Sequence, residues 1–343
     1  MAGRGALMAA RRRPPAPGWL IGGAACLLAI LVPPVLGSDQ LNLPTEVLIF
    51  AMVAVTYDLI FGITGLISFG QALFMGAGAY ATAIAMTTYH LSLVLALAAA
   101  GGTGLVLAVL TGALALRTHG VYFAMVTLAF AQAAYTLVES DIGNLTGGEN
   151  GLLISGGPDW LLRPGNEAHL YYVALAALVG GFLLVRLLVR SPAGRVWQAI
   201  RENETRARML GFPPYRYKLM SYTISGTLAA LAGGLYALFV GDVSPGLLTP
   251  DTTIQLLLMV IIGGAGSLWG AVLGAAIVRG LDHYLNVLST SSLANSGPSW
   301  LHDVLAQPLL LFGIIYLLLV YFFPNGIAGL AHYRRIGGTA IEP

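Results

Sequence analysis

Long apolar stretches recur along the chain with lengths that fit helices crossing a lipid bilayer. A hydrocarbon core needs about 20 apolar residues per helix. The pattern predicts ten such segments, at 19–37, 44–63, 71–90, 92–116, 119–138, 169–189, 218–240, 252–266, 268–288 and 304–323. The eighth is short for a crossing, so it is predicted as a half-helix or as part of a re-entrant hairpin with the ninth. We therefore expect an all-α polytopic transmembrane bundle of about ten spans, with eight or nine as alternatives.

The composition indicates that lipid is the solvent over most of the chain. Of the 343 residues, 57% are hydrophobic and 9% are charged, whereas roughly a quarter of the residues in a soluble domain are charged. A chain with so few charged groups cannot cover a water-exposed surface. The 44 glycines are typical of transmembrane helices that pack closely through small residues.

The basic residues predict the orientation, because short loops rich in arginine and lysine stay on the cytoplasmic side. They gather in the N-terminal segment 1–18, in the loop between the sixth and seventh spans, and in the tail 326–343. With ten crossings all three places fall on one side, so the transmembrane portion is 19–325 and both termini are cytoplasmic. The loop 139–168 is then external, and it carries five acidic residues and a single arginine.

The first apolar segment has a second interpretation, as a cleaved signal peptide. Its basic start, its apolar run and a small residue at Gly37 fit that pattern. However, the apolar run of about 18 residues is longer than the usual core of about 7–15 residues. A retained membrane anchor is therefore favoured, and cleavage would leave nine crossings.

The segment 191–211 is predicted to form an amphipathic helix on the cytoplasmic side. Ser191 is a suitable N-cap, Pro192 occupies the first helical position, and Gly211 followed by two prolines ends the helix. Apolar residues recur on one face, namely Val196, Ile200, Ala207 and Leu210. Such a helix is too charged to span, so it lies on the membrane surface or docks into another protein. The alternative is a basic loop that only fixes the topology.

The sequence excludes several kinds of active site. Lys218, the only lysine, is followed by Leu219, so the chain has no G-x-x-x-x-G-K-[ST] loop for ATP. Cys26 is the only cysteine, which excludes internal disulfides and cysteine metal sites. Neither H-E-x-x-H nor G-x-S-x-G occurs, and the six histidines are scattered. We therefore predict no catalytic residue, no metal ligand, no cofactor bound by this chain and no nucleic-acid partner.

A series of motifs follows one order along the chain. The most informative is GRVWQAIRENE at 194–204, followed by YKL at 217–219. The segment GLISFGQA at 65–72 and IGGAGSLWG at 262–270 extend the series. Together they resemble the LivM-type permeases of ABC importers for branched-chain amino acids, and the resemblance covers about 45–325.

The resemblance implies partners and a place in the cell. A LivM-type permease pairs with a LivH-like permease in the bacterial inner membrane. Two LivG/LivF-like ATPase subunits bind ATP and Mg²⁺, and a periplasmic solute-binding protein delivers the solute. The segment 191–211 would engage the ATPase, through Arg195, Ile200, Arg201, Glu202, Asn203, Glu204 and Arg208.

Polar side chains at membrane depth are costly, so they usually face a cavity or a partner. Asp58, in the second span, either contacts a solute or satisfies a neighbouring polar group. The other candidates for a solute pathway are Gln71, Tyr80, Tyr122, Thr127 and Gln132. The family often has Asn, His and Glu in place of Asp58, Gln71 and Gln132. These departures leave the solute open, because related permeases carry urea, amides or aromatic acids.

The main alternative function is that of a stand-alone, ion-coupled secondary transporter. Such a protein needs ion ligands near the middle of the membrane, and Asp58 is the one clear candidate. The capped cytoplasmic helix and the resemblance favour the other class. We therefore predict the membrane subunit of an ATP-driven, high-affinity importer for branched-chain amino acids or related small solutes.

Overall fold

The structure of the chain is a computed structural model that describes residues 29–36, 40–141, 143, 145–154, 167–290, 313, 317 and 326. The predicted spans 19–37 and 304–323 lie largely outside these residues, as do the basic N-terminus 1–18 and the tail 326–343. Of the first span, the structure describes the short helix α2 (Val32–Leu36).

Apolar helices occupy the eight other predicted spans. Within the described residues, five of them are long and apolar enough to cross a membrane. The prediction of a polytopic helical bundle is therefore confirmed. The helices are α3 (Asn42–Asp58), which continues as the π-helical turn η2 (Leu59–Ile63), α4 (Gln71–Thr87), α5 (Leu93–Ala115), α6 (Val121–Glu139), α8 (Glu167–Arg190), α11 (Pro214–Val240), α12 (Pro250–Gly263) and α13 (Leu268–Thr290).

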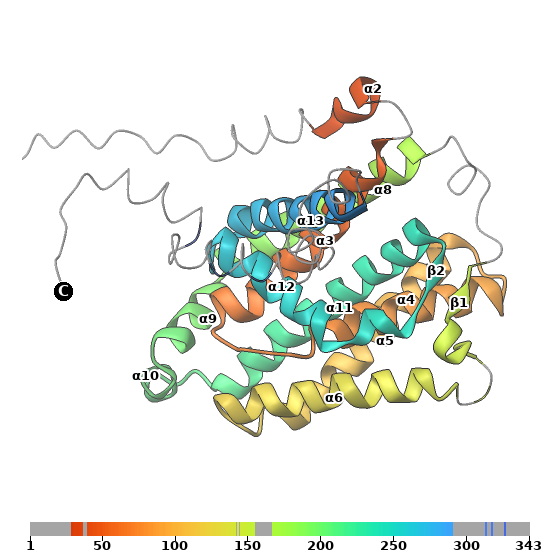
Figure 1. Cartoon of the computed structure of the whole chain (residues 1–343). Helices are drawn as coiled ribbons and strands as arrows, with labels where there is room; N and C mark the ends of the chain where they lie inside the picture. Colours follow the sequence, from red (N-terminus) through yellow and green to blue (C-terminus); the bar gives the residue numbers. More distant parts are fainter. Residues whose placement is uncertain are drawn as a thin grey trace, which may run out of the picture.

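The centre of the bundle is formed by α3, α4 and α11. In α3 with η2, 78% of the most apolar window is buried, and in α11 56% is buried, against 22% in α5 and 28% in α6. The helices α5 and α6 are apolar on their exposed faces as well, as expected where the neighbour is lipid or another membrane protein rather than water. In Figure 1 α6 accordingly lies along one side of the bundle.

Glycines allow α4 and α11 to pack backbone to backbone. A side chain at Gly78 of α4 would overlap the backbone carbonyl of Ala230, and one at Gly233 of α11 would overlap the carbonyl of Met75. On α5, Gly104 lies against the Cβ of Ala230, so a side chain at Gly104 would overlap that of Ala230. The expectation that the glycines mark close helix contacts is thus met here.

The eighth predicted span is a half-helix. At 14 residues, α12 is about 21 Å long, which is shorter than the hydrocarbon core. Figure 1 shows that it begins in the middle of the bundle and runs to the end where α9 and α10 lie. A turn at 264–267 joins it to α13, and Gly263 and Gly274 bring the two helices into backbone contact. The eighth and ninth predicted spans thus form two separate helices that pack against each other rather than one fused element.

The bundle has two different ends. The helices α9 (Pro192–Glu202) and α10 (Glu204–Met209) lie at one end, and a small antiparallel ribbon of β1 (Leu152–Leu153) and β2 (Asp242–Val243) lies at the other (Figure 1). We call these the α9 end and the ribbon end. The short helices η3 (Gly148–Asn150) and η4 (Pro245–Leu248) flank the ribbon strands.

The described part of the loop 139–168 is an ordered turn at the ribbon end. Asp141 Oδ1 accepts hydrogen bonds from the backbone N–H of Thr146, at 2.9 Å, and of Gly147, at 3.1 Å. The hydrogen bond from the Thr146 N–H is the main reason why the pKa of the Asp141 carboxyl lies below its usual range. A charged acceptor of several N–H groups keeps the turn in one conformation.

The close contact of α4 with α11 predicts that the stability of the protein depends strongly on Gly78. We expect Gly78→Ala to lower the stability by about 1–3 kcal/mol relative to Gly102→Ala, because the added methyl group overpacks the helix contact. Gly102 on α5 has open space around it, so its substitution gains the same helix propensity without a clash. Thermal unfolding in detergent, followed by tryptophan fluorescence, measures the difference. Equal midpoints for the two variants would contradict this account.

Candidate functional site

The segment 191–211 forms two helices rather than one, so the prediction of a single helix was wrong. Ser191 caps α9 as predicted, because its Oγ accepts the N–H of Gly194 at 3.4 Å. The chain then breaks at Asn203, whose backbone is extended at φ −159° and ψ 101°. Asn203 Oδ1 accepts the N–H of Arg206 at 2.8 Å and so caps α10. Asparagine favours this arrangement, because its side chain competes with the helical backbone and is a good N-cap.

The apolar face of this segment anchors it to the bundle. Trp197 is fully buried, and its indole N–H donates to the Tyr217 carbonyl at 2.8 Å. The buried side chains of Val196, Ile200 and Ala207 form one cluster against Tyr217. Leu210, predicted to lie on the same face, is instead 68% exposed, at the residue that follows the end of α10.

The charged residues predicted to engage an ATPase fall into two groups. Arg195, Glu202, Asn203 and Arg208 are exposed at the α9 end. Glu204 instead forms an ion pair with Lys218 at 2.6 Å, which ties α10 to α11. Arg201 also bonds within the chain, as its guanidinium donates to the carbonyl of Gly62. The buried Ile200 belongs to this anchoring group.

A cavity of about 580 Å³ opens beside the segment at the α9 end. Residues within 64–69, 116–124 and 200–204 line the cavity. We call it the α9 cavity. Its lining includes Arg201, Glu202 and Lys218, so both signs of charge face it.

Asp58 is completely buried where α3 passes into η2. Its Oδ1 accepts the backbone N–H of Gly266, in the turn between α12 and α13, at 2.7 Å. Of the two roles predicted for Asp58, this contact corresponds to the structural one. The second oxygen, Oδ2, is buried and has no hydrogen-bond partner within the described residues.

A layer of polar side chains surrounds the start of α4 inside the bundle. Gln71 donates through Nε2 to Thr56 Oγ1, at 3.3 Å, and to Ser225 Oγ, at 3.2 Å. The N–H of Ala72 donates to Thr253 Oγ1 at 3.0 Å. We call this group the polar layer; its members are Thr56, Ser68, Gln71, Thr127, Ser225 and Thr253, all fully buried.

Hydroxyl groups of the polar layer accept hydrogen bonds from backbone N–H groups at the start of α4 and in the two residues before it. Besides the bond to Thr253, the N–H of Phe69 donates to Thr127 Oγ1 at 3.0 Å, and the N–H of Gly70 donates to Ser68 Oγ at 3.2 Å. A helix that starts away from water needs such partners, because its first N–H groups have none within the helix.

The structure brings together some of the predicted pathway residues and separates others. Gln71 and Thr127 meet in the polar layer, while Tyr80 is buried farther along α4, with its hydroxyl unpaired within the described residues. Tyr122, which is 73% exposed, and Gln132 instead lie on the outer face of α6. Gln71, Thr127 and Tyr80 therefore lie inside the bundle, whereas Tyr122 and Gln132 lie on its outside.

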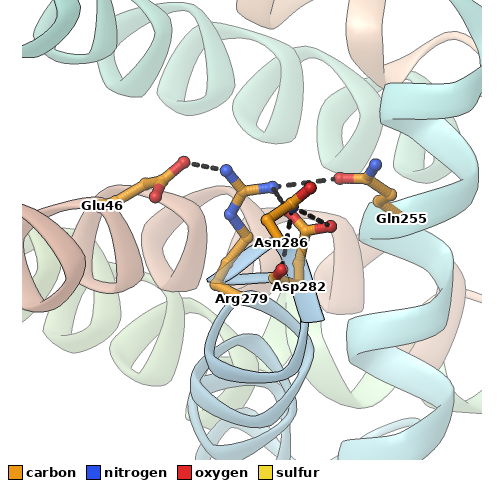
Figure 2. A network of polar contacts seen from close by, with 5 residues as sticks. All are labelled: Glu46, Gln255, Arg279, Asp282 and Asn286. Carbon is orange, nitrogen blue, oxygen red and sulfur yellow. Dashed lines mark hydrogen bonds and ion pairs between the residues drawn. The ribbon is translucent and has the colours of Figure 1, made fainter. Parts of the chain in front are cut away.

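A charged network that sequence reasoning missed joins α3, α12 and α13. Figure 2 shows the guanidinium of Arg279 between Glu46 and Gln255, with Asp282 on its own helix. The guanidinium also lies over the ring of Phe50, at 4.2 Å from its centroid. A visible signal existed, since Arg279 stands well inside the ninth predicted span, and a charge at such a position requires partners.

Comparison with known proteins is consistent with this architecture. Residues 41–321 match the family described as "Branched-chain amino acid transport system / permease component". The chain belongs to this family. It is therefore a transport subunit in a membrane, and the predicted resemblance to LivM-type permeases is confirmed.

The individual relatives are described as permease proteins as well. The chain is 30% identical over 279 residues to the "High-affinity branched-chain amino acid transport system permease protein LivM" of Salmonella typhimurium and to that of Escherichia coli, covering 74% of this chain and 65% of each relative. It is 26% identical over 320 residues to the "Probable branched-chain amino acid transport permease protein LivM" of Methanocaldococcus jannaschii. This match covers 81% of this chain and 90% of the relative. The "Autoinducer 2 import system permease protein LsrC" of Klebsiella pneumoniae is 32% identical over 180 residues. This match covers 49% of this chain and 48% of the relative. No solved structure matches the chain.

The caps on α4 predict that the permease depends on the hydroxyl of Thr253. Thr253→Val keeps the shape but leaves the buried N–H of Ala72 without an acceptor, which we expect to cost about 1–3 kcal/mol of stability. Thr253→Ser should restore most of it. Thr252→Val is the matched control, because no hydrogen bond of its side chain is seen in the described part of the chain. Thermal unfolding in detergent measures all three, and an equal cost for the two valine variants would contradict the capping role.

The network in Figure 2 predicts that its charges depend on one another. Arg279→Gln leaves Glu46 without its cation, and we expect it to destabilise the protein by about 2–5 kcal/mol. In Glu46→Gln/Arg279→Gln the loss should be smaller than the sum of the two single losses. A double-mutant cycle on unfolding in detergent measures this coupling. Additive losses would show that the two side chains do not interact.

Proposed function

We propose that the chain is the membrane subunit of an ATP-driven importer for branched-chain amino acids or related small solutes. Family membership supports the class of transport system. The anchored α9–α10 segment is the observation that supports the dependence on ATP. It is fixed to α11 by Trp197 and by the Glu204–Lys218 ion pair. A segment held this firmly can pass the movement of a bound protein to the membrane helices.

The partners follow from the same proposal. Two LivG/LivF-like ATPase subunits bind ATP and Mg²⁺ and dock on the exposed Arg195, Glu202, Asn203 and Arg208 at the α9 end. A LivH-like permease completes the pathway beside this chain. A periplasmic solute-binding protein docks at the ribbon end, where the turn around Asp141 is ordered.

The location and orientation belong to the same proposal. The protein spans the bacterial inner membrane several times, with the α9 end and both termini in the cytoplasm. The basic residues near 191–218 support this orientation, because arginine and lysine are retained on the cytoplasmic side. The ribbon end then faces the periplasm.

The contact of Asp58 favours this function over that of an ion-coupled secondary transporter. Such a transporter would need Asp58 as an ion ligand, together with further oxygen ligands near it. Instead, one carboxylate oxygen is committed to the N–H of Gly266 at 2.7 Å. This contact supports a structural role for the residue that the alternative depends on.

Purification of the chain from its native membrane in mild detergent tests the proposal. We expect a second permease and P-loop ATPases to be recovered with it. We also expect uptake of labelled leucine, isoleucine or valine into proteoliposomes to require ATP together with the solute-binding protein. An ion gradient without ATP should not drive uptake. Recovery of the chain alone, with uptake that follows an ion gradient and ignores ATP, would contradict the proposal.

A further inference from the structure

Arg201 reaches from α9 into the membrane helices. Its Nη1 donates to the carbonyl of Gly62, which lies in the π-helical turn η2 at the end of α3. The stem of the side chain passes Gly65, where a Cβ would lie 2.9 Å from Arg201 Cγ. Arg201 is itself exposed, but it differs from the other exposed charges of the segment because its charged end contacts the end of a central helix.

The turn between α12 and α13 lies beside the same contact of Arg201 with Gly62. The N–H of Gly266 donates to Asp58 Oδ1 at 2.7 Å, across the backbone of Gly62. A side chain at Gly62 would overlap both of these groups, and one at Gly266 would lie 3.1 Å from Arg201 Nη1. The helix α9, the turn η2 and the turn between α12 and α13 therefore converge on a few atoms. We call this point the Arg201 junction.

The half-helix α12 links this junction to the polar layer. It ends at Gly263, three residues before Gly266, and near its other end Thr253 caps the N–H of Ala72 at 3.0 Å. A helix of about 21 Å behaves as a rigid element over this length. A displacement at the Arg201 junction therefore shifts the hydroxyl group that caps α4.

The turn η2 is the element in this region that can change its geometry. π-Helical turns are rare, contain an extra residue and occur often at functional sites. In η2 the wide turn brings the Gly62 carbonyl within reach of Arg201. A return to a regular α-helical turn would withdraw this acceptor, so the Arg201 bond and the π-turn depend on each other.

We propose that Arg201 is a positioning residue, which transmits movement of the α9–α10 segment through Gly62 and Gly266 to the half-helix α12 and the polar layer. This role rests on the proposed function, and it separates Arg201 from the residues that dock an ATPase. Its carboxylate counterpart is Asp58, which holds the Gly266 side of the junction.

The test compares Arg201→Ala with Arg190→Ala in the complete complex, with partner subunits, in proteoliposomes. Arg190 is an exposed arginine at the end of α8, so its removal changes the surface charge by the same amount. For Arg201→Ala we expect co-purification of the ATPase subunits at the normal level, but roughly tenfold less solute transported per ATP hydrolysed. For Arg190→Ala we expect an unchanged ratio. Arg201→Lys should recover little, because an ammonium group lacks the reach and the planar fork of the guanidinium.

A second variant perturbs the Arg201 junction through the membrane helices instead of through α9. Gly62→Ala displaces Asp58 from Gly266 without altering the surface of α9, so it should also lower the ratio of transport to hydrolysis. A normal ratio in Arg201→Ala would overturn the inference, and so would loss of the ATPase subunits from that variant, because Arg201 would then be a docking residue. Failure of the unmodified chain to recover any ATPase would contradict the proposed function itself.

Discussion

The backbone donors at the start of α4 impose the strictest requirement on this bundle. The helix begins at Gln71, inside the protein, where water is not available to accept its first N–H groups. Hydroxyl groups from four separate helices and from the preceding loop accept hydrogen bonds from these backbone donors or from the side chain of Gln71. To place Thr127, Thr253 and Ser225 around one helix end, α6, α12 and α11 must each have a defined depth and rotation.

The glycines make this arrangement possible by bringing the backbones together. Without side chains at Gly78 and Gly233, α4 and α11 approach until their backbones touch, which places Ser225 within hydrogen-bond distance of Gln71. In lipid, packing of this kind replaces the hydrophobic effect as the force that holds helices together. The same contact therefore provides both stability and the position of the polar layer.

Charged side chains tie the half-helix α12 and the turn after it to neighbouring helices. Toward the α9 end, Asp58 accepts the N–H of Gly266 in the turn that follows α12, and Arg201 donates to the adjacent carbonyl of Gly62. Along its length, Gln255 contacts Arg279, which is paired with Glu46. Buried or half-buried charges are costly unless they are paired, so these contacts restrict how α12 can move relative to α3 and α13.

The order and the lengths of the helices were predictable from the sequence, because the free energy of inserting a helix depends on a local run of apolar residues. All eight predicted spans that fall in the described residues correspond to helices, and the N-cap at Ser191 was also predicted from local chemistry. The break at Asn203 is local too, but it was hidden by an amphipathic pattern that continues across it. An asparagine in the middle of that pattern was the signal for the break.

Only the tertiary structure decided what the polar residues do. Gln71 and Thr127 were recognised as candidates, yet Thr253 and Ser225, which complete the polar layer, look like ordinary hydroxyl residues in apolar spans. Glu46 and Arg279 are 233 residues apart in the sequence, and no local pattern indicates that they meet. The physical reason is that an apolar run determines whether a segment crosses the membrane, whereas hydrogen bonds between helices depend on the rotation and depth of each helix. Those two quantities are set by the close packing of the whole bundle.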